Sequence, residues 1–357
     1  MIQGRIQALQ QHLQPGEALL VESGPNRQYL TGFASSAGSV VLTRERAVFF
    51  IDFRYVEKAR QVVKTCEVVL AARPAEQLAD FLSAAGCTRL YTEVSHTSVA
   101  RHHQLKKLLP ELEVSAEATL EQALLAQRAI KSPDEVACIR QAQAMTEDTF
   151  TYILSRITPG RTEQEIMLDM EFYMRRLGSE GVSFDFIVVS GKNSSLPHGV
   201  PGDRTVAAGD FVTMDFGAVV DGYRSDMTRT VAVGHADEEM RRVYATVLEA
   251  QTRALAAIHP GAICSAVDKV ARDYIDAAGY AGCFGHGLGH SVGLEIHENP
   301  SFSPRCDTVL HTGHVMTVEP GIYLENRFGV RIEDMVLVTE NSHENLTKSE
   351  KELIILT

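Results

Sequence analysis

Short apolar runs alternate with amphipathic stretches through roughly the first 125 residues of the chain. Runs of four or five residues rich in Val, Ile, Leu and Phe predict buried strands, and apolar residues at three- or four-residue spacing predict helices. Elements of both kinds that alternate along the chain are typical of an α/β domain with its own sheet. The predicted strands are residues 18–21, 40–43, 47–51 and 89–92, and the predicted helices are residues 2–13, 56–63, 75–85 and 97–109.

A helix start near residue 130 marks the beginning of a second domain. Ser132 can cap this helix, Pro133 suits its first position, and the two acidic residues that follow face the positive end of the helix dipole. We therefore predict an N-terminal α/β domain at residues 1–128 and a second domain at residues 129–357.

The second domain repeats one order of elements, which is helix, Pro-Gly, helix, Gly and an extended segment. The two prolines lie 101 residues apart, and so do the two final glycines. Such an internal repeat predicts a pseudo-twofold sheet backed by two helix pairs. The first copy comprises helix 133–157, Pro159-Gly160, helix 162–177 and Gly178, and the second comprises helix 238–258, Pro260-Gly261, helix 264–278 and Gly279.

Each copy continues into an apolar run that is bounded by glycines and carries one carboxylate. The acid is Asp215 in the first run and Glu319 in the second, and both stand six residues after the first glycine and two before the last. A turn-rich segment and another run with a second acid follow in each copy. We therefore expect each half of the domain to form a hairpin with two carboxylates. The second acids are Asp226 and Glu333.

The turn chemistry of the first hairpin predicts its register. Asp221-Gly222 favours a two-residue turn. With that turn, Gly217 falls opposite Asp226, and Asp215 and Asp226 become diagonal neighbours on one face, roughly 7 to 8 Å apart at Cα. Their side chains can then share a metal ion.

Three histidines stand among four glycines in residues 284–298, just before the second hairpin. Glycines beside the histidines do not suit the helical zinc-protease motif and favour an extended or looped segment instead. One imidazole joined to four carboxylates makes an oxygen-rich site, which suits manganese, ferrous iron or cobalt at least as well as zinc. Carboxylates and a water can bridge two such ions, and the water becomes the nucleophile. The histidines are His286, His290 and His297.

Composition narrows the function classes. The formal net charge of -12 over 357 residues argues against nucleic acid as a partner, because phosphate binding needs a concentrated basic face. The first 14 residues lack the apolar core of a signal peptide, and no run reaches the roughly 18 apolar residues of a membrane span. The six cysteines are scattered without a Cys-x-x-Cys pair, so we expect reduced thiols and a cytoplasmic location.

Some acids and histidines outside the paired frames are assigned no direct role. A lone acid or histidine is more often structural than functional, whereas four acids in two matched frames favour a dinuclear metal site. We expect Glu298, Glu325 and Asp334 to be surface residues or to support the site indirectly. We expect surface or structural roles for His102, His103, His311 and His314.

Seven motifs in the chain point to one family. They are Ser195-Leu-Pro-His198-Gly, Asp215-Phe-Gly, Ser225-Asp226-Met-Thr-Arg229-Thr, His286-Gly-Leu-Gly-His290, His297-Glu, Val318-Glu319-Pro-Gly-Ile-Tyr323 and Gly329-Val-Arg331-Ile-Glu333-Asp. With them the chain resembles, over nearly its whole length, the Xaa-Pro peptidases of the creatinase and methionine-aminopeptidase superfamily. The resemblance implies a small creatinase-type α/β domain followed by a catalytic domain of the pita-bread fold.

The resemblance also implies a set of site residues and a cofactor. Two divalent metal ions per subunit are implied, with manganese favoured and cobalt, zinc or iron as alternatives. In the implied mechanism, Glu319 accepts a proton from the bridging water and relays it toward the leaving proline nitrogen. The implied metal ligands are Asp215, Asp226, His290, Glu319 and Glu333. The implied catalytic residues are His198, His286, His297, Glu319 and Arg331, and the implied substrate-binding residues are His198, His297, Tyr323 and Arg331.

The implied substrate is a peptide with proline at the second position, and the implied assembly is a homodimer. We favour an Xaa-Pro aminopeptidase that takes both dipeptides and longer chains. The alternative is a prolidase, an enzyme restricted to dipeptides, which must hold the proline carboxylate with a cation such as Arg331, Arg46 or Arg54. A methionine aminopeptidase is disfavoured by the extra N-terminal domain, and a non-catalytic relative by the intact ligand set.

Overall fold

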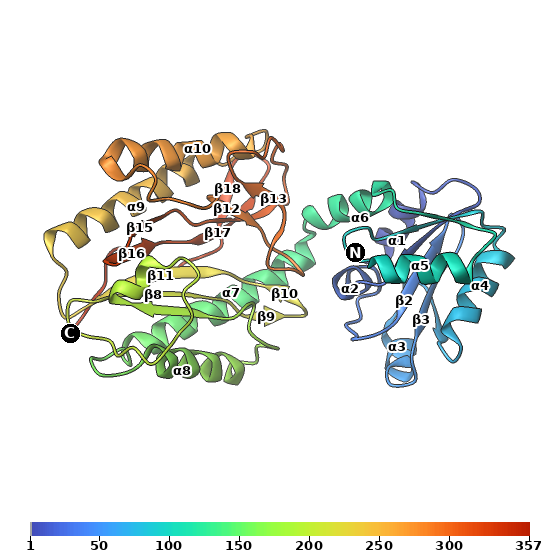
Figure 1. Cartoon of the computed structure of the whole chain (residues 1–357), viewed down its shortest axis with the longest axis horizontal. Helices are drawn as coiled ribbons and strands as arrows, with labels where there is room; N and C mark the ends of the chain where they lie inside the picture. The colour runs from blue at the N-terminus through green and yellow to red at the C-terminus, as the bar shows by residue number, and fades with distance from the viewer. Residues whose placement is uncertain (1) are drawn as a thin grey trace. The chain divides into compact units, whose positions relative to one another are not determined.

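The computed structural model describes residues 2–357, and the chain divides into two compact units at residues 1–128 and 129–357. The N-terminal unit is built on a six-stranded mixed sheet with the order β4-β3-β2-β1-β5-β6. β1 pairs with β2 antiparallel and with β5 parallel, so that its buried apolar residues lie at the centre of the sheet (Figure 1). The strands are β1 (Glu17–Val21), β2 (Ser39–Thr43), β3 (Ala47–Ile51), β4 (Glu67–Leu70), β5 (Arg89–Thr92) and β6 (Glu113–Ser115).

The N-terminal unit also contains six helices. The sequence-based prediction misses four elements of this unit, namely the strands β4 and β6 and the helices α2 and α6. β4 and β6 are short strands at the sheet edges, where partial exposure weakens the apolar pattern. Helix α2 begins at the Ser23 cap and buries polar Asn26 and Arg27, so it lacks an apolar face to detect. The helices are α1 (Gln3–Gln10), α2 (Gly24–Thr31), α3 (Val56–Val62), α4 (Pro74–Ala84), α5 (Val99–Leu108) and α6 (Thr119–Ala129).

The C-terminal unit contains the two expected helix pairs. α7 (Pro133–Leu154) and α8 (Glu163–Arg176) form the first pair, and α9 (Glu238–Ala256) and α10 (Cys264–Ile275) form the second. Side chains cap the starts of α8 and α9, whereas Ile263 at the start of α10 provides no side-chain cap. In α9, for example, the Asp237 carboxylate accepts a hydrogen bond from the Met240 N–H at 2.8 Å. Among residues 2–357, every helix is too short or too polar to cross a membrane.

Two sheets lie between the helix pairs, and all their strand pairs are antiparallel except β11 with β19, which is parallel. The first has the order β19-β11-β8-β7 and the second has the order β13-β12-β14-β17-β18. The central strand of each half, β8 or β14, carries or directly precedes the first acid of that half. The first sheet comprises β7 (Ile187–Ser190), β8 (Phe211–Phe216), β11 (Met227–Val233) and β19 (Ile355–Leu356). The second comprises β12 (Gly289–Ser291), β13 (Glu298–Phe302), β14 (Val315–Val318), β17 (Asp334–Val338) and β18 (His343–Asn345).

The expected single sheet is therefore two sheets, and their seam has a physical cause. Along β11, side chains take over bonds that backbone groups would otherwise make. Thr230 Oγ1 accepts from the Arg331 N–H at 3.3 Å and donates to the Arg331 carbonyl at 3.0 Å. One backbone bond also crosses the seam, from the Glu333 N–H to the Thr228 carbonyl at 3.1 Å.

Each helix pair closes its own hydrophobic core on one side of the two sheets. Figure 1 shows α7 and α8 beside β8 and β11, with α9 and α10 on the opposite side. The first core joins the first helix pair to β7, β8 and β11, and the second joins the second pair to β14 and β17. The two acid hairpins consequently meet between two packed layers, as the repeat predicts.

The predicted register of the first hairpin is confirmed. Asp221 and Gly222 have positive φ angles of 48° and 78°, as a two-residue turn requires. They join β9 (Val219–Val220) to β10 (Tyr223–Arg224). Asp215 pairs with Thr228 and Phe216 with Met227, so Gly217 and Asp226 come next in the same register.

The second hairpin differs from the first by one loop residue. β15 (Gly321–Leu324) and β16 (Phe328–Arg331) are joined by three residues, and the central one, Asn326, has a φ of 57°. Gly321 pairs with Arg331, and Val318 pairs with Asp334. Glu319 and Glu333 therefore fall directly opposite one another, whereas the two acids of the first hairpin are diagonal neighbours.

The close approach at Gly217 yields a stability prediction. A Cβ atom at this position would lie 1.8 Å from the Ser225 carbonyl oxygen, so Gly217→Ala must push the two hairpin strands apart. We expect it to lower the free energy of unfolding by about 1 to 3 kcal/mol or more. Gly181→Ala is the matched control because a Cβ there meets nothing within 4 Å. Equal urea midpoints for the two variants would contradict the prediction.

Candidate active site

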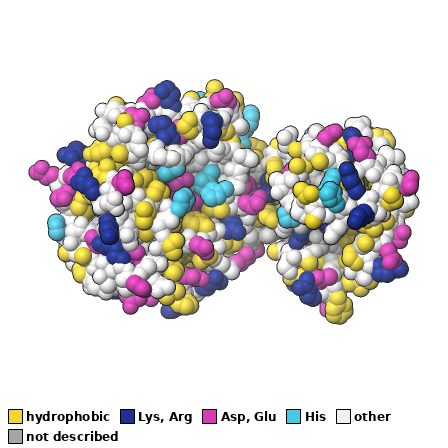
Figure 2. Space-filling model, viewed as in Figure 1, with side chains coloured by type: hydrophobic (Ala, Val, Ile, Leu, Met, Phe, Trp, Pro, Cys, Tyr) yellow, Lys and Arg dark blue, Asp and Glu magenta, His cyan; other side chains and the backbone are white. Residues whose placement is uncertain are grey.

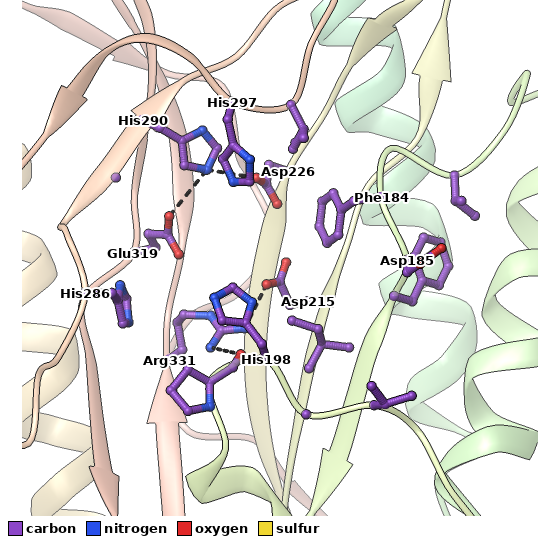
Figure 3. A pocket seen from close by; sticks show the side chains of 18 of the residues that line it. Phe184, Asp185, His198, Asp215, Asp226, His286, His290, His297, Glu319 and Arg331 are labelled. Atoms are coloured by element: carbon purple, nitrogen blue, oxygen red, sulfur yellow. Dashed lines mark hydrogen bonds and ion pairs between the residues drawn. The ribbon is translucent and has the colours of Figure 1, made fainter.

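A cavity of about 850 Å³ lies in the C-terminal unit and receives side chains from both sheets. Figure 2 shows histidine side chains gathered near the centre of the face of this unit that it presents. Figure 3 shows two facing groups of side chains in the cavity, with Asp226, His290 and His297 in one and Asp215 and His198 in the other. The cavity is therefore lined by eight of the ten predicted site residues, all except Tyr323 and Glu333.

The four predicted acids are brought together by the ends of four strands. Asp215 lies in β8, Asp226 immediately precedes β11, Glu319 follows β14, and Glu333 precedes β17. All four residues are mostly or fully buried. Ligand atoms of Asp226 and Glu333 lie within 4.8 Å of each other and of a ring nitrogen of His290.

Three of the carboxylates each have one buried oxygen without a partner, and in two of them the other oxygen is bonded within the protein. Asp215 Oδ2 accepts from Arg331 Nη2 at 2.7 Å, and Glu333 Oε2 accepts from Thr228 Oγ1 at 2.8 Å. Among residues 2–357, the buried atoms Asp215 Oδ1, Asp226 Oδ1 and Glu333 Oε1 accept no hydrogen bond. Buried acceptors without partners are rare and costly, so these oxygens require another species to satisfy them.

Burial and mutual repulsion disfavour the charged forms of Asp226, Glu319 and Glu333 in the bare protein. The pKa of Asp226 and that of Glu333 are raised well above their usual values by burial first and then by the neighbouring carboxylates. Burial, with Asp215 adding to it, raises the pKa of Glu319 to about 8, although Arg331 opposes the shift. A cluster of oxygens that repel one another and lack partners fits divalent cations.

His290 is oriented as a ligand of such cations would be. Its Nδ1 lies 3.2 Å from the Ser291 carbonyl, which fixes the proton on that nitrogen and leaves Nε2 with a free lone pair. Nε2 is 3.6 Å from Asp226 Oδ2 and 3.5 Å from Glu319 Oε1. Burial, together with nearby His297, lowers the pKa of His290 to about 4, so the ring is neutral at pH 7.

Arg331 links the acid cluster to the rest of the cavity wall. Besides its bond to Asp215, its Nη1 donates to Tyr323 Oη at 2.9 Å and to the Pro197 carbonyl at 3.2 Å. Tyr323 Oη in turn lies 2.8 Å from His286 Nε2. Burial, with the charge of Arg331, lowers the pKa of His286 to about 4, so this histidine is a neutral hydrogen-bonding group.

The remaining predicted histidines lie on the open wall of the cavity. His198 and His297 line it and are more exposed than His290. The His297 ring is edge-on to the His290 ring, with centroids 4.5 Å apart. Burial, and then His198, lowers the pKa of His297. These two side chains can reach a bound substrate without contacting the buried carboxylate oxygens that lack partners.

Several predicted surface or supporting residues are placed more sharply by the structure. Glu325 is exposed, as expected. Asp334, by contrast, is fully buried and accepts from Arg229 Nη2 at 2.8 Å, while Arg229 Nη1 donates to the Glu333 carbonyl. His314 is buried and its Nδ1 accepts from the His311 N–H at 2.9 Å, so its role is structural.

A supporting pair on α10 has no counterpart in the sequence-based prediction. Arg272 Nη2 donates to the His286 carbonyl and to Asp268 Oδ1, at 2.8 and 2.9 Å. Asp268 Oδ1 also accepts from the Leu288 N–H at 3.0 Å. The available signal was an Asp four residues before an Arg on one helix face. That spacing is common on exposed helices and by itself does not indicate a site.

Two family models match the chain. The model of metallopeptidase family M24 matches residues 137–340, and that of the creatinase/prolidase N-terminal domain matches residues 5–129. These matches confirm the expected fold, a creatinase-type N-terminal domain followed by a pita-bread domain.

Relatives and solved structures resemble the chain over nearly its whole length. An Xaa-Pro dipeptidase of Pyrococcus horikoshii is 35% identical over 339 residues, which cover 95% of this chain and 94% of the relative. The structure of an Xaa-Pro dipeptidase from Bacillus anthracis is 39% identical, with a TM-score of 0.96 and 100% coverage of both chains. The structure of an X-Pro aminopeptidase from Thermotoga maritima is 33% identical, with a TM-score of 0.91 and coverage of 97% and 99%.

The acid cluster predicts opposite effects of one substitution with and without metal. Asp226→Asn removes one charge from the cluster, so the metal-free variant should melt at the same temperature as the metal-free wild type or higher. Manganese at 100 times its Kd should stabilise the wild type by about 2.7 kcal/mol and the variant far less. The measurement is the melting temperature with and without Mn²⁺.

Asp185→Asn provides the control for this measurement, because Asp185 lines the same cavity but does not belong to the acid cluster. This control should respond to Mn²⁺ as the wild type does. An Mn²⁺ response of Asp226→Asn as large as that of the wild type would exclude Asp226 as a ligand.

Proposed function

The chain belongs to metallopeptidase family M24, and we propose that it hydrolyses the bond between an N-terminal residue and a proline at the second position. The observation that carries the proposal is the cluster of four buried carboxylates and His290, which opens onto a cavity lined by His198 and His297. The full-length similarity to proteins named Xaa-Pro dipeptidase and X-Pro aminopeptidase supports the substrate class.

We further propose that two divalent cations are held by the cluster, and the oxygens without partners support this. The oxygen-rich donor set favours manganese, with cobalt, zinc or iron as alternatives. Divalent cations bound here would lower the pKa of a coordinated water and polarise the substrate carbonyl. The proposed ligands are Asp215, Asp226, His290, Glu319 and Glu333.

Three side chains are proposed to act on the substrate itself. The nitrogen of an Xaa-Pro bond carries no hydrogen and must be protonated as it leaves, so a positioned proton carrier is required. We assign this role to Glu319, which lines the cavity with its Oε1 3.5 Å from His290 Nε2. His198 and His297 on the open wall are placed to donate hydrogen bonds to the developing oxyanion.

His286, Tyr323 and Arg331 form a hydrogen-bonded chain beside these groups. Arg331 fixes Asp215 and Tyr323, and Tyr323 fixes His286. We propose that Arg331 and Tyr323 also contact the substrate from this wall. Because this series of hydrogen bonds joins two different hairpins, it also fixes the acids of the two hairpins relative to each other.

The charges that line the cavity bear on substrate length. Among the described residues that line it, the only Lys or Arg is Arg331, which is already paired with Asp215 at 2.7 Å. A dipeptide-specific enzyme must neutralise the proline carboxylate, because a desolvated carboxylate without a partner costs several kcal/mol. The other candidate cations, Arg46 and Arg54, are paired with Glu67 and Asp52 in the N-terminal unit. We therefore propose that both Xaa-Pro and Xaa-Pro-Yaa are cleaved.

Three further proposals have separate grounds. The family resemblance supports a homodimeric assembly, the scattered free cysteines support a cytoplasmic location, and the oxygen-rich donor set supports the preference for manganese over the other metals. The strict dipeptidase remains the second candidate function, and the names of two full-length relatives favour it. A methionine aminopeptidase is less well supported because the chain has a creatinase/prolidase N-terminal domain.

Kinetics on four peptides test the substrate class and length. We expect Ala-Pro and Ala-Pro-Ala to be turned over by the Mn²⁺ enzyme, and Ala-Ala and Met-Ala-Ala to be cleaved far more slowly. Efficient cleavage of Ala-Pro with none of Ala-Pro-Ala would establish the strict dipeptidase. Preferential cleavage of Met-Ala-Ala would overturn the proposed function.

His297→Ala separates a substrate-contacting role from a ligand role. Loss of a transition-state hydrogen bond should reduce kcat by about 100- to 1,000-fold. The metal content, measured by atomic absorption, should stay at the wild-type value because His297 is not a proposed ligand. His290→Ala, the matched comparison, should lose metal. Loss of metal from His297→Ala as well would make His297 a ligand.

A further inference from the structure

A buried lysine at the start of the C-terminal unit, Lys131, contacts residues next to the histidines of the cavity. The Lys131 ammonium donates to Ser291 Oγ at 2.9 Å and to Glu298 Oε2 at 3.1 Å. The Lys131 and Glu298 side chains are only 1% and 7% exposed. The Lys131 N–H also donates to the Gly313 carbonyl at 2.9 Å, so the backbone at this residue is fixed as well.

The two residues that Lys131 joins are a directly opposed pair of the β12/β13 hairpin. Ser291 ends β12, Glu298 begins β13, and they are register partners. The residue before each of them is a histidine of the cavity, His290 or His297. Both imidazoles reach into the cavity (Figure 3), whereas the side chains of Ser291 and Glu298, the residues that follow them, contact the lysine.

The backbone of this hairpin does not by itself fix the position of the histidines. Between His290 and Ser291 the register shifts, so that Ser301 is opposite the first and Glu298 opposite the second. An irregularity of this kind disrupts the ladder and lets a strand bend. Side-chain contacts must therefore define where the loop between the histidines lies.

The Glu298 carboxylate is the point around which that loop closes. Its Oε1 accepts from the Glu295 N–H at 3.3 Å. A Cβ on Gly293 would lie 2.5 Å from the same oxygen, so a larger residue there would displace the Glu298 carboxylate from the loop. Holding the Glu298 side chain thus holds the loop of residues 292–297, and the loop carries His297.

We propose that Lys131 is a positioning residue, which through Ser291 and Glu298 sets where His290 and His297 stand in the cavity. The inference deepens the proposed function and depends on it for the roles of the two histidines. A buried ion pair is weak evidence for stability, because the cost of desolvation offsets much of the attraction. Partners behind metal ligands, by contrast, typically affect metal affinity or activity by about 10- to 100-fold.

The test removes the pair without leaving a buried charge. Lys131→Met alone leaves Glu298 uncompensated and can unfold the protein, so the informative variant is Lys131→Met/Glu298→Gln. The matched control is Arg140→Met/Glu344→Gln, which removes an ion pair between α7 and β18 on the same unit. Ser291→Ala is a third variant, which removes one contact of the ammonium and no charge.

Two measurements on the metal-free protein report position without any substrate. The first is the set of ring signals of His290 and His297 in carbon–proton NMR spectra, assigned by their loss in His290→Ala and His297→Ala. The second is Mn²⁺ affinity by calorimetry. In the Lys131→Met/Glu298→Gln variant both ring signals should shift and the Kd for Mn²⁺ should rise by about 10- to 100-fold. Ser291→Ala should show smaller changes, and the Arg140→Met/Glu344→Gln control none.

Kinetics on Ala-Pro complete the test. At saturating Mn²⁺, kcat of the Lys131→Met/Glu298→Gln variant should fall at least about 10-fold, with KM changed less than kcat and a melting temperature close to that of the control. Unshifted ring signals together with wild-type Kd and kcat would overturn the proposal. The proposal would also fail if the decrease in kcat were fully explained by the fraction of the variant that is unfolded. If the wild type fails to cleave Ala-Pro, the proposed function falls, while the metal-free measurements still decide the role of Lys131.

Discussion

The mutual repulsion of four buried carboxylates is the constraint on which the rest of the C-terminal unit depends. Asp215, Asp226, Glu319 and Glu333 come from two half-domains that pack against separate helix pairs. In the bare protein the charges push the two halves apart, and burial raises the cost further. Hydroxyl and guanidinium groups tie the strands together across the seam, and the buried oxygens without partners are the ones that we propose bind cations.

Four cationic side chains lie around this cluster and support it. Arg331 neutralises one acid and links it to the opposite hairpin, and Arg229 bonds the backbone of another acid while paired with Asp334. Arg272 holds the segment that precedes His290, and Lys131 holds the residues that follow the two cavity histidines. Each contacts a residue of the proposed site or the neighbour of one, and none bonds to the three buried oxygens that lack partners.

Local sequence signals predict those parts of the structure that local chemistry determines. The register of the first hairpin follows from Asp221-Gly222, and the repeat follows from proline and glycine stops, which act within a few residues. The sequence did not predict that the two acids are diagonal neighbours in the first hairpin but directly opposite in the second. The cause is the three-residue loop around Asn326, which replaces the two-residue turn. The roles of Lys131 and Arg229 could not be predicted, because each meets a partner more than a hundred residues away. No spacing rule connects such residues before the fold is known.

Crystals grown with Mn²⁺ and measured near its absorption edge would test the central claim most directly, since anomalous scattering locates the metal without reference to activity. The account predicts two peaks between the hairpins, with carboxylate oxygens from Asp215 or Asp226 and from Glu319 or Glu333 on each, and with His290 Nε2 on one of them. Peaks bound by acids of one hairpin alone, or no peak at the cluster, would contradict it.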